Sequence, residues 1–101
     1  MSTTDKPAAC LAIEGELSIY RATELKQTLL DAVNGASSLE IDLHDVSEID
    51  SAGIQLLMLT KSYGQANACE VHLVNHSPAV LEVFELLDLA AHFGDPLLVP
   101  A

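Results

Sequence analysis

The strongest constraint on the fold is a pair of short alternating segments on either side of one long apolar segment. Residues 39–43 and 71–74 alternate apolar and polar side chains, which predicts two strands that each turn one face to water. Residues 51–66, between them, are rich in apolar residues and predict a helix. Because a helix separates the two strands, this order favours parallel pairing through a crossover connection.

The amino-terminal part predicts a similar arrangement. Residues 8–13 and 16–19 read as two strands, and Gly15 permits a tight turn between them. Residues 22–33 carry apolar side chains at helical spacing, and Gly35 is a plausible stop for that helix. Strands covered by helices on both faces are usually apolar throughout, so the alternation indicates helices mainly on one face of the sheet.

The carboxyl-terminal part predicts one more helix. Ser77 is its expected N-cap, and Pro78 is expected in its first turn. Residues 89–93 are expected to add a further turn of helix. The length of 101 residues indicates one domain spanning residues 1–101, with residues 1–8 as a loose N-terminal tail.

The charge of the chain excludes two classes of partner. Four Lys and Arg stand against 15 Asp and Glu, so the net charge is −11 at pH 7. Phosphate backbones and anionic lipid headgroups are bound by neutralising their charge, which this composition does not favour. We therefore expect no nucleic acid and no direct membrane insertion. No apolar run approaches the roughly 18 residues of a membrane span, and we expect a cytoplasmic protein.

The segment from Leu43 to Leu57, with the sequence LHDVSEIDSAGIQLL, carries the clearest functional signal. A strand ends, an acidic loop follows, and a helix begins at Asp50-Ser51. A hydroxyl at a helix amino terminus lies where free N–H groups and the helix dipole favour an added anion. Gly53 leaves the first turn without a side chain, so another protein could approach closely. Taken alone, Ser51 is better explained as an ordinary N-cap, because Ser and Asp are the leading residues at that position.

Ile41–Leu43, Val46–Ser47 and Ile49–Ile54 together resemble the signature of STAS domains, the fold of anti-sigma factor antagonists. Gly15–Leu17 and Val71–Val74 extend the resemblance over nearly the whole chain. The resemblance implies an α/β fold, namely a single small STAS-like domain with a mixed four- to five-stranded sheet. It also implies a non-enzymatic protein-interaction switch rather than an enzyme.

In antagonists of this family, the serine that matches Ser51 is phosphorylated by a partner that is both serine kinase and anti-sigma factor. The unphosphorylated form binds that partner, and a phosphatase resets the cycle. The family often has Ser or Thr at the next position, where this chain has Ala52. The expected residues of the site are Ser51 for phosphorylation and, for partner binding, Asp50, Ala52, Gly53, Ile54 and Met58.

Charge and helix geometry suggest how such a switch would work. A phosphate on Ser51 would add about −1.5 to −2 charge. Beside Asp45, Glu48 and Asp50, this charge would weaken partner binding without refolding the domain. The predicted helix has one apolar stripe that includes Leu56 and a second that includes Ile54 and Met58, and only one can face the sheet. The other is either buried by neighbouring helices or exposed as a docking surface.

Other readings of the sequence are less favoured. The G-x-S-x-G elbow of serine hydrolases is absent around Ser51. A receiver domain phosphorylated on Asp42 or Asp45 would be longer. His72 and His76 fall on a strand and a turn, so they do not form a helical metal pair, and no phosphate-binding loop occurs. We expect no metal and no cofactor. The main alternative is a constitutive STAS subunit of a phospholipid-transport ATPase complex or of a chemotaxis-type signalling complex, with Ser51 unmodified.

Overall fold

Strands and helices alternate along the chain. The computed structural model describes residues 6–87. The elements, in order, are β1 (Ala8–Leu17), α1 (Ala22–Asn34), β2 (Ser38–Ile49), α2 (Ser51–Ala66), β3 (Glu70–Val74) and α3 (Pro78–Leu86). Within residues 6–87, no helix is both long enough and apolar enough to cross a membrane.

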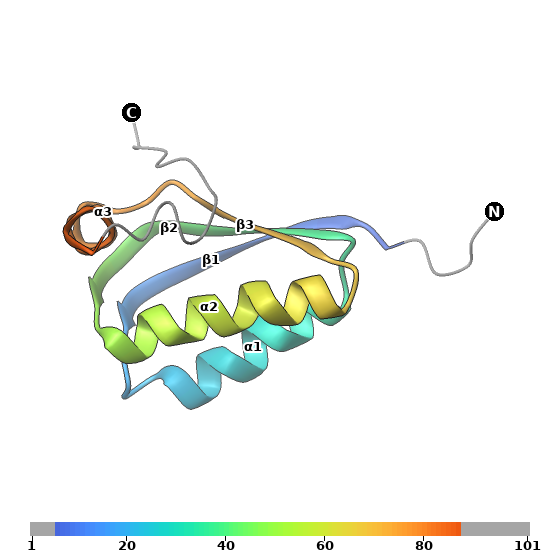
Figure 1. Cartoon of the computed structure of the whole chain (residues 1–101), viewed down its shortest axis with the longest axis horizontal. Coiled ribbons are helices and arrows are strands. Elements are labelled where there is room, and N and C mark those ends of the chain that lie inside the picture. The colour runs from blue at the N-terminus through green and yellow to red at the C-terminus, as the bar shows by residue number, and fades with distance from the viewer. Residues whose placement is uncertain (1–5, 88–101) are drawn as a thin grey trace.

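The three described strands form one parallel sheet in the order β1-β2-β3. Each connecting helix runs back along the sheet, so the carboxyl ends of the strands gather at one end of the molecule. Helices α1 and α2 lie side by side on one side of the sheet, and α3 lies at the carboxyl ends of the strands on the other side (Figure 1). The prediction that helices lie mainly on one face is confirmed, since two of the three described helices, α1 and α2, lie on the same side of the sheet (Figure 1).

The strand number differs from the prediction because the first two predicted strands are one. Gly15 has a φ of 81°, a conformation that glycine adopts without steric cost. The register against β2 shifts between Ala12 and Glu14 and again between Gly15 and Glu16. Gly15 thus lies at a bulge that bends β1 instead of reversing it. The described part of the sheet therefore has three parallel strands, and not the four to five strands of a mixed sheet.

Strand β2 is also longer than predicted. The acidic segment after Leu43 was expected to be a loop, but it continues as strand to Ile49 and pairs with β1 as far as Leu17. The bent second half of β1 supplies the hydrogen-bonding partner that keeps this polar segment extended. The pairing places Glu14 beside Asp45 and Glu16 beside Glu48.

Helix boundaries follow the sequence closely. Helix α2 spans the predicted residues 51–66, and α1 ends next to the predicted stop at Gly35. Ser77 is the N-cap of α3, and its Oγ accepts a hydrogen bond from the Val80 N–H at 3.2 Å. The central core residues are almost fully buried; they are Leu17, Leu29, Leu39, Ile41, Leu43, Leu57, Leu73 and Phe84.

Two predictions concern the ends of the chain. Ala8 already belongs to β1, so the amino-terminal tail is shorter than residues 1–8. Residues 1–5 and the helical turn expected at residues 89–93 lie outside the described residues.

Candidate functional site

Asp50 organises the corner at which α2 begins. It is the N-cap of α2, and its Oδ1 accepts a hydrogen bond from the Gly53 N–H at 3.0 Å. Its other oxygen, Oδ2, accepts from the Ile19 N–H at 3.1 Å. Its own N–H donates to the Leu17 carbonyl at 3.3 Å. One residue therefore ties the start of α2 to the loop that follows β1.

These hydrogen bonds favour the charged form of Asp50. The Gly53 N–H, and after it the Ile19 N–H, hold the pKa of the carboxyl below the ordinary value of 3.8, because both donate to the carboxylate. Asp50 is thus an anion at neutral pH. Its charge stays at the amino terminus of α2, where the helix dipole stabilises it.

Ser51 is the first residue of α2 and is exposed. Because Asp50 supplies the cap, the interpretation of Ser51 as an ordinary N-cap is wrong. A hydroxyl at this position can be reached by a modifying enzyme, and the positive end of the α2 dipole lies near any anion placed on it. The structure thus places the predicted phosphoacceptor at an exposed helix start.

Two of the five residues expected to contact a partner are buried. Gly53 is buried, and a Cβ added to it would lie 2.1 Å from the Leu17 carbonyl oxygen. Its missing side chain therefore allows α2 to approach β1, instead of making room for a partner. Ile54 is only 8% exposed. Ala52 and Met58 are half-buried, as is Asp50.

Two exposed apolar residues beside this corner were not singled out from the sequence. Ile19 is 66% exposed and Tyr20 is 89% exposed. They lie one residue beyond the end of β1, and the hydrogen bond from the Ile19 N–H to Asp50 holds their loop against the start of α2. The signal in the sequence is the apolar pair Ile19-Tyr20 at the end of the strand predicted over residues 16–19.

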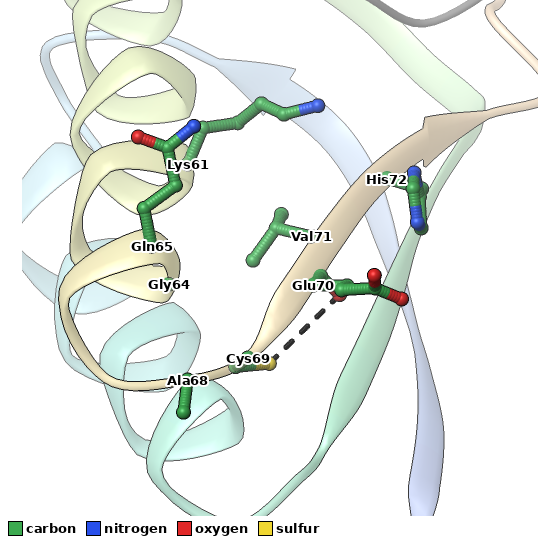
Figure 2. A pocket seen from close by; sticks show the side chains of 8 residues that line it. All are labelled: Lys61, Gly64, Gln65, Ala68, Cys69, Glu70, Val71 and His72. Carbon is green, nitrogen blue, oxygen red and sulfur yellow. Dashed lines mark hydrogen bonds between the residues drawn. The ribbon is translucent and has the colours of Figure 1, made fainter.

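A separate hollow lies at the other end of α2. Lys61, Gly64 and Gln65 of α2 line it together with residues 68–72. In Figure 2, Val71 of β3 points toward α2, whereas His72 lies on the other side of the strand. Burial raises the pKa of the Cys69 thiol at its edge, which disfavours the reactive thiolate. No group of three or more His, Cys, Asp or Glu side chains that could hold a metal occurs within the described residues. The corner at Ser51 is therefore the stronger candidate site.

Comparison with known proteins adds independent evidence. The family model described as Mlab, STAS domain, matches residues 2–100. The anti-sigma-B factor antagonist of Bacillus subtilis (strain 168) is 29% identical over 77 residues, which are 76% of this chain and 71% of that protein.

Solved structures share the fold. An anti-sigma factor antagonist from Mycobacterium paratuberculosis has a TM-score of 0.74 at 24% identity, over 91% of this chain and 76% of that one. The anti-sigma factor antagonist SpoIIAA in its unphosphorylated form has a TM-score of 0.69 at 22% identity, over 95% of this chain and 84% of that one. Its phosphorylated form has a TM-score of 0.64 at 21% identity, over 95% and 86%.

Proposed function

Because the chain belongs to the STAS domain family, we propose that it is a non-enzymatic protein-interaction switch of the anti-sigma factor antagonist type, controlled by phosphorylation of Ser51. The proposed partner is a cytoplasmic serine kinase that also acts as an anti-sigma factor. The observation that carries the proposal is the exposed Ser51 hydroxyl at the first position of α2, with the cap already supplied by Asp50.

Phosphorylation would change the charge of the corner and leave its packing in place. The kinase would transfer a phosphoryl group from a nucleoside triphosphate to Ser51 Oγ, releasing the diphosphate, while the hydroxyl proton leaves to a base of the kinase. The product adds about −1.5 to −2 charge beside Asp50 and the nearby Glu48. The amino terminus of α2 offsets only part of this charge. A docked partner would then meet repulsion and a cost of desolvation.

The contact surface proposed here differs in part from the one expected from the sequence. Gly53 and Ile54 lie in the core, and we assign them to holding α2 against β1. Ala52 and Met58 remain as half-buried contacts. The exposed Ile19 and Tyr20 supply the apolar area that partner surfaces typically bury at their centre.

The relatives support the same type of function. The Bacillus subtilis relative is an anti-sigma-B factor antagonist. SpoIIAA, which shares the fold, is known in both phosphorylated and unphosphorylated forms. A phosphatase that removes the phosphate would complete the cycle.

The test compares three variants of the full chain as bait in the native cell extract. Ser51→Ala should retain the kinase partner, Ser51→Asp should lose it, and mass spectrometry of the wild type should find phosphate on Ser51. Ser62→Asp is the matched control, because Ser62 is also exposed on α2 but lies far from its amino terminus. Equal capture by all variants without phosphate on Ser51 would instead favour a constitutive STAS subunit.

A further inference from the structure

A groove of about 420 Å³ lies beside the start of α2. Its walls come from the carboxyl ends of β1 and β2, from the loop after β1 and from α3. Asp50, the N-cap of α2, is one of the residues that line it. The groove therefore adjoins the Ser51 corner and is separate from the hollow near Cys69.

The charge of the groove has one sign. Four carboxylates line it, from Glu16, Glu48, Asp50 and Glu82, and none of its described lining residues is Lys or Arg. Arg21 lies close by, but its guanidinium donates to the backbone carbonyls of Glu14 and Glu16 and pairs with Glu24 at 3.4 Å. A cation supplied from outside would therefore be attracted to the groove.

Strand pairing concentrates this charge at a cost to the fold. Glu16 and Glu48 are neighbours in the register of β1 and β2. Like charges placed opposite each other on adjacent strands destabilise a sheet. Charged residues that only keep a protein in solution need not lie opposite each other on neighbouring strands. A cation bound between the strands would relieve the repulsion between Glu16 and Glu48.

Ser18 is a second, independent sign of a missing ligand. It lines the groove and is only 8% exposed. Its Oγ is buried and has no hydrogen-bond partner among the described residues. Buried hydroxyls are nearly always hydrogen-bonded, because losing water without replacement costs free energy. A ligand with N–H donors would satisfy this oxygen.

Tyr20 adds an aromatic surface at the same groove. It is one of the lining residues, and it is 89% exposed. Aromatic faces attract cations, and a guanidinium both stacks on an aromatic ring and pairs with carboxylates through several N–H donors. Lysine offers a point charge and no planar surface.

From these features we infer that the groove receives an arginine side chain of the partner protein. The guanidinium pairs with the carboxylates of Glu48 and Glu82, stacks on Tyr20 and donates to Ser18 Oγ. The inference rests on the proposed function only in taking the ligand to be part of a protein that docks at the Ser51 corner. The preference of the groove for arginine can be measured without that partner.

The experiment titrates the 15N-labelled full chain with the peptide acetyl-Gly-Arg-Gly-Arg-Gly-amide at low ionic strength. Amide shifts should concentrate at Ser18, Tyr20 and Glu82. Matched peptides carry lysine, or the uncharged isostere citrulline, in place of arginine. Both should bind at least about threefold more weakly, because citrulline loses the positive charge and lysine loses the planar group with several N–H donors. Equal binding of the citrulline or lysine peptide would overturn the inference.

Variants of the protein distinguish binding of arginine in the groove from general attraction by the net negative charge. Glu82→Gln and Ser18→Ala should each weaken arginine binding, and Ser18→Ala should not lower the melting temperature, because it removes an unsatisfied hydroxyl. Glu70→Gln makes the same charge change at the amino end of β3, away from the groove, and should have little effect. If Glu70→Gln weakens binding as much as Glu82→Gln, long-range attraction explains the result and the inference fails.

The proposed phosphorylation switch at Ser51 and the proposed arginine groove can be contradicted independently of each other. Ser51→Ala should bind the arginine peptide as the wild type does, because Ser51 does not line the groove. Absence of phosphate on Ser51 together with retained arginine binding would contradict the proposed function alone. Ser51-dependent partner binding that is unaffected by Glu82→Gln would contradict the arginine groove alone.

Discussion

Single residues hold the Ser51 corner together. The Asp50 carboxylate joins the first turn of α2 to Ile19, which lies 31 residues earlier in the chain. Gly53 lets the backbone of α2 approach the carbonyl of Leu17. Asp50 and Gly53, which lie on either side of the exposed Ser51 in the motif, therefore both have structural roles.

A glycine-to-alanine substitution tests this role of Gly53. In an open helical site the change would stabilise by about 0.5–1 kcal/mol through helix propensity. Here the added Cβ would lie 2.1 Å from the Leu17 carbonyl oxygen, so we expect Gly53→Ala to lower the free energy of unfolding by about 1–3 kcal/mol or more. Urea denaturation measures the difference.

Gly35→Ala is the matched control for that substitution. The nearest atom to its added Cβ is the Asp31 carbonyl oxygen at 3.6 Å, an ordinary contact, so the variant should keep nearly wild-type stability. If Gly53→Ala proves as stable as Gly35→Ala, Gly53 does not serve close packing, and a partner contact becomes the better explanation.

The pKa of Asp50 predicts a pH dependence. The folded-state pKa lies below the ordinary value of 3.8, so the charged form stabilises the fold above that value and the contribution is lost as pH falls through the lowered pKa. Asp50→Asn can still cap but carries no charge. Wild type should therefore be more stable than the variant at pH 7, and the difference should shrink below about pH 4. A difference in melting temperature that stays constant from pH 7 to pH 3 would contradict this.

At the scale of elements, α2 shows why an apolar helix is hard to orient from sequence. The buried residues of α2 are Gly53, Ile54, Leu56, Leu57, Thr60 and Gly64, which combine parts of both predicted stripes. The helix packs on α1 as well as on the sheet, so it buries a wider arc than one stripe. The second stripe is therefore mostly covered, which was one of the two alternatives. The exposed large apolar side chains of the described residues lie in the loop after β1 (Ile19 and Tyr20), on α2 (Leu59) and at the end of α3 (Leu86 and Leu87).

The length of strand β2 is also hard to predict from sequence. Its acidic half has too few apolar residues to predict a strand, yet it pairs with β1 to its last residue. The pairing depends on the bulge at Gly15, which bends β1 along β2. A single glycine with positive φ is compatible with either a turn or a bulge, and only the register against another strand distinguishes them.

For the whole molecule, the net charge of −11 predicts a dependence on salt. Self-repulsion destabilises a compact acidic chain, and salt screens it over about 10 Å at 0.1 M. Raising NaCl from about 20 mM to about 200 mM should therefore raise the melting temperature. A Glu48→Gln variant should gain less, because it lacks one of the paired carboxylates. An unchanged or lower wild-type melting temperature would show that the charges are already compensated within the chain.

The sequence by itself determined the order of strands and helices from α1 onward, the limits of α2, the cap of α3 and the position of Ser51 at a helix start, because caps, periodicity and glycine stops are local. It also pointed to the STAS family through a local motif. Only the tertiary structure decided that Gly53 and Ile54 are buried, that Ile19 and Tyr20 are exposed, and that four carboxylates from three elements share one groove. Burial and the distance between charges depend on which segments pack together in the folded chain, and a local sequence pattern does not determine which distant segments pack together.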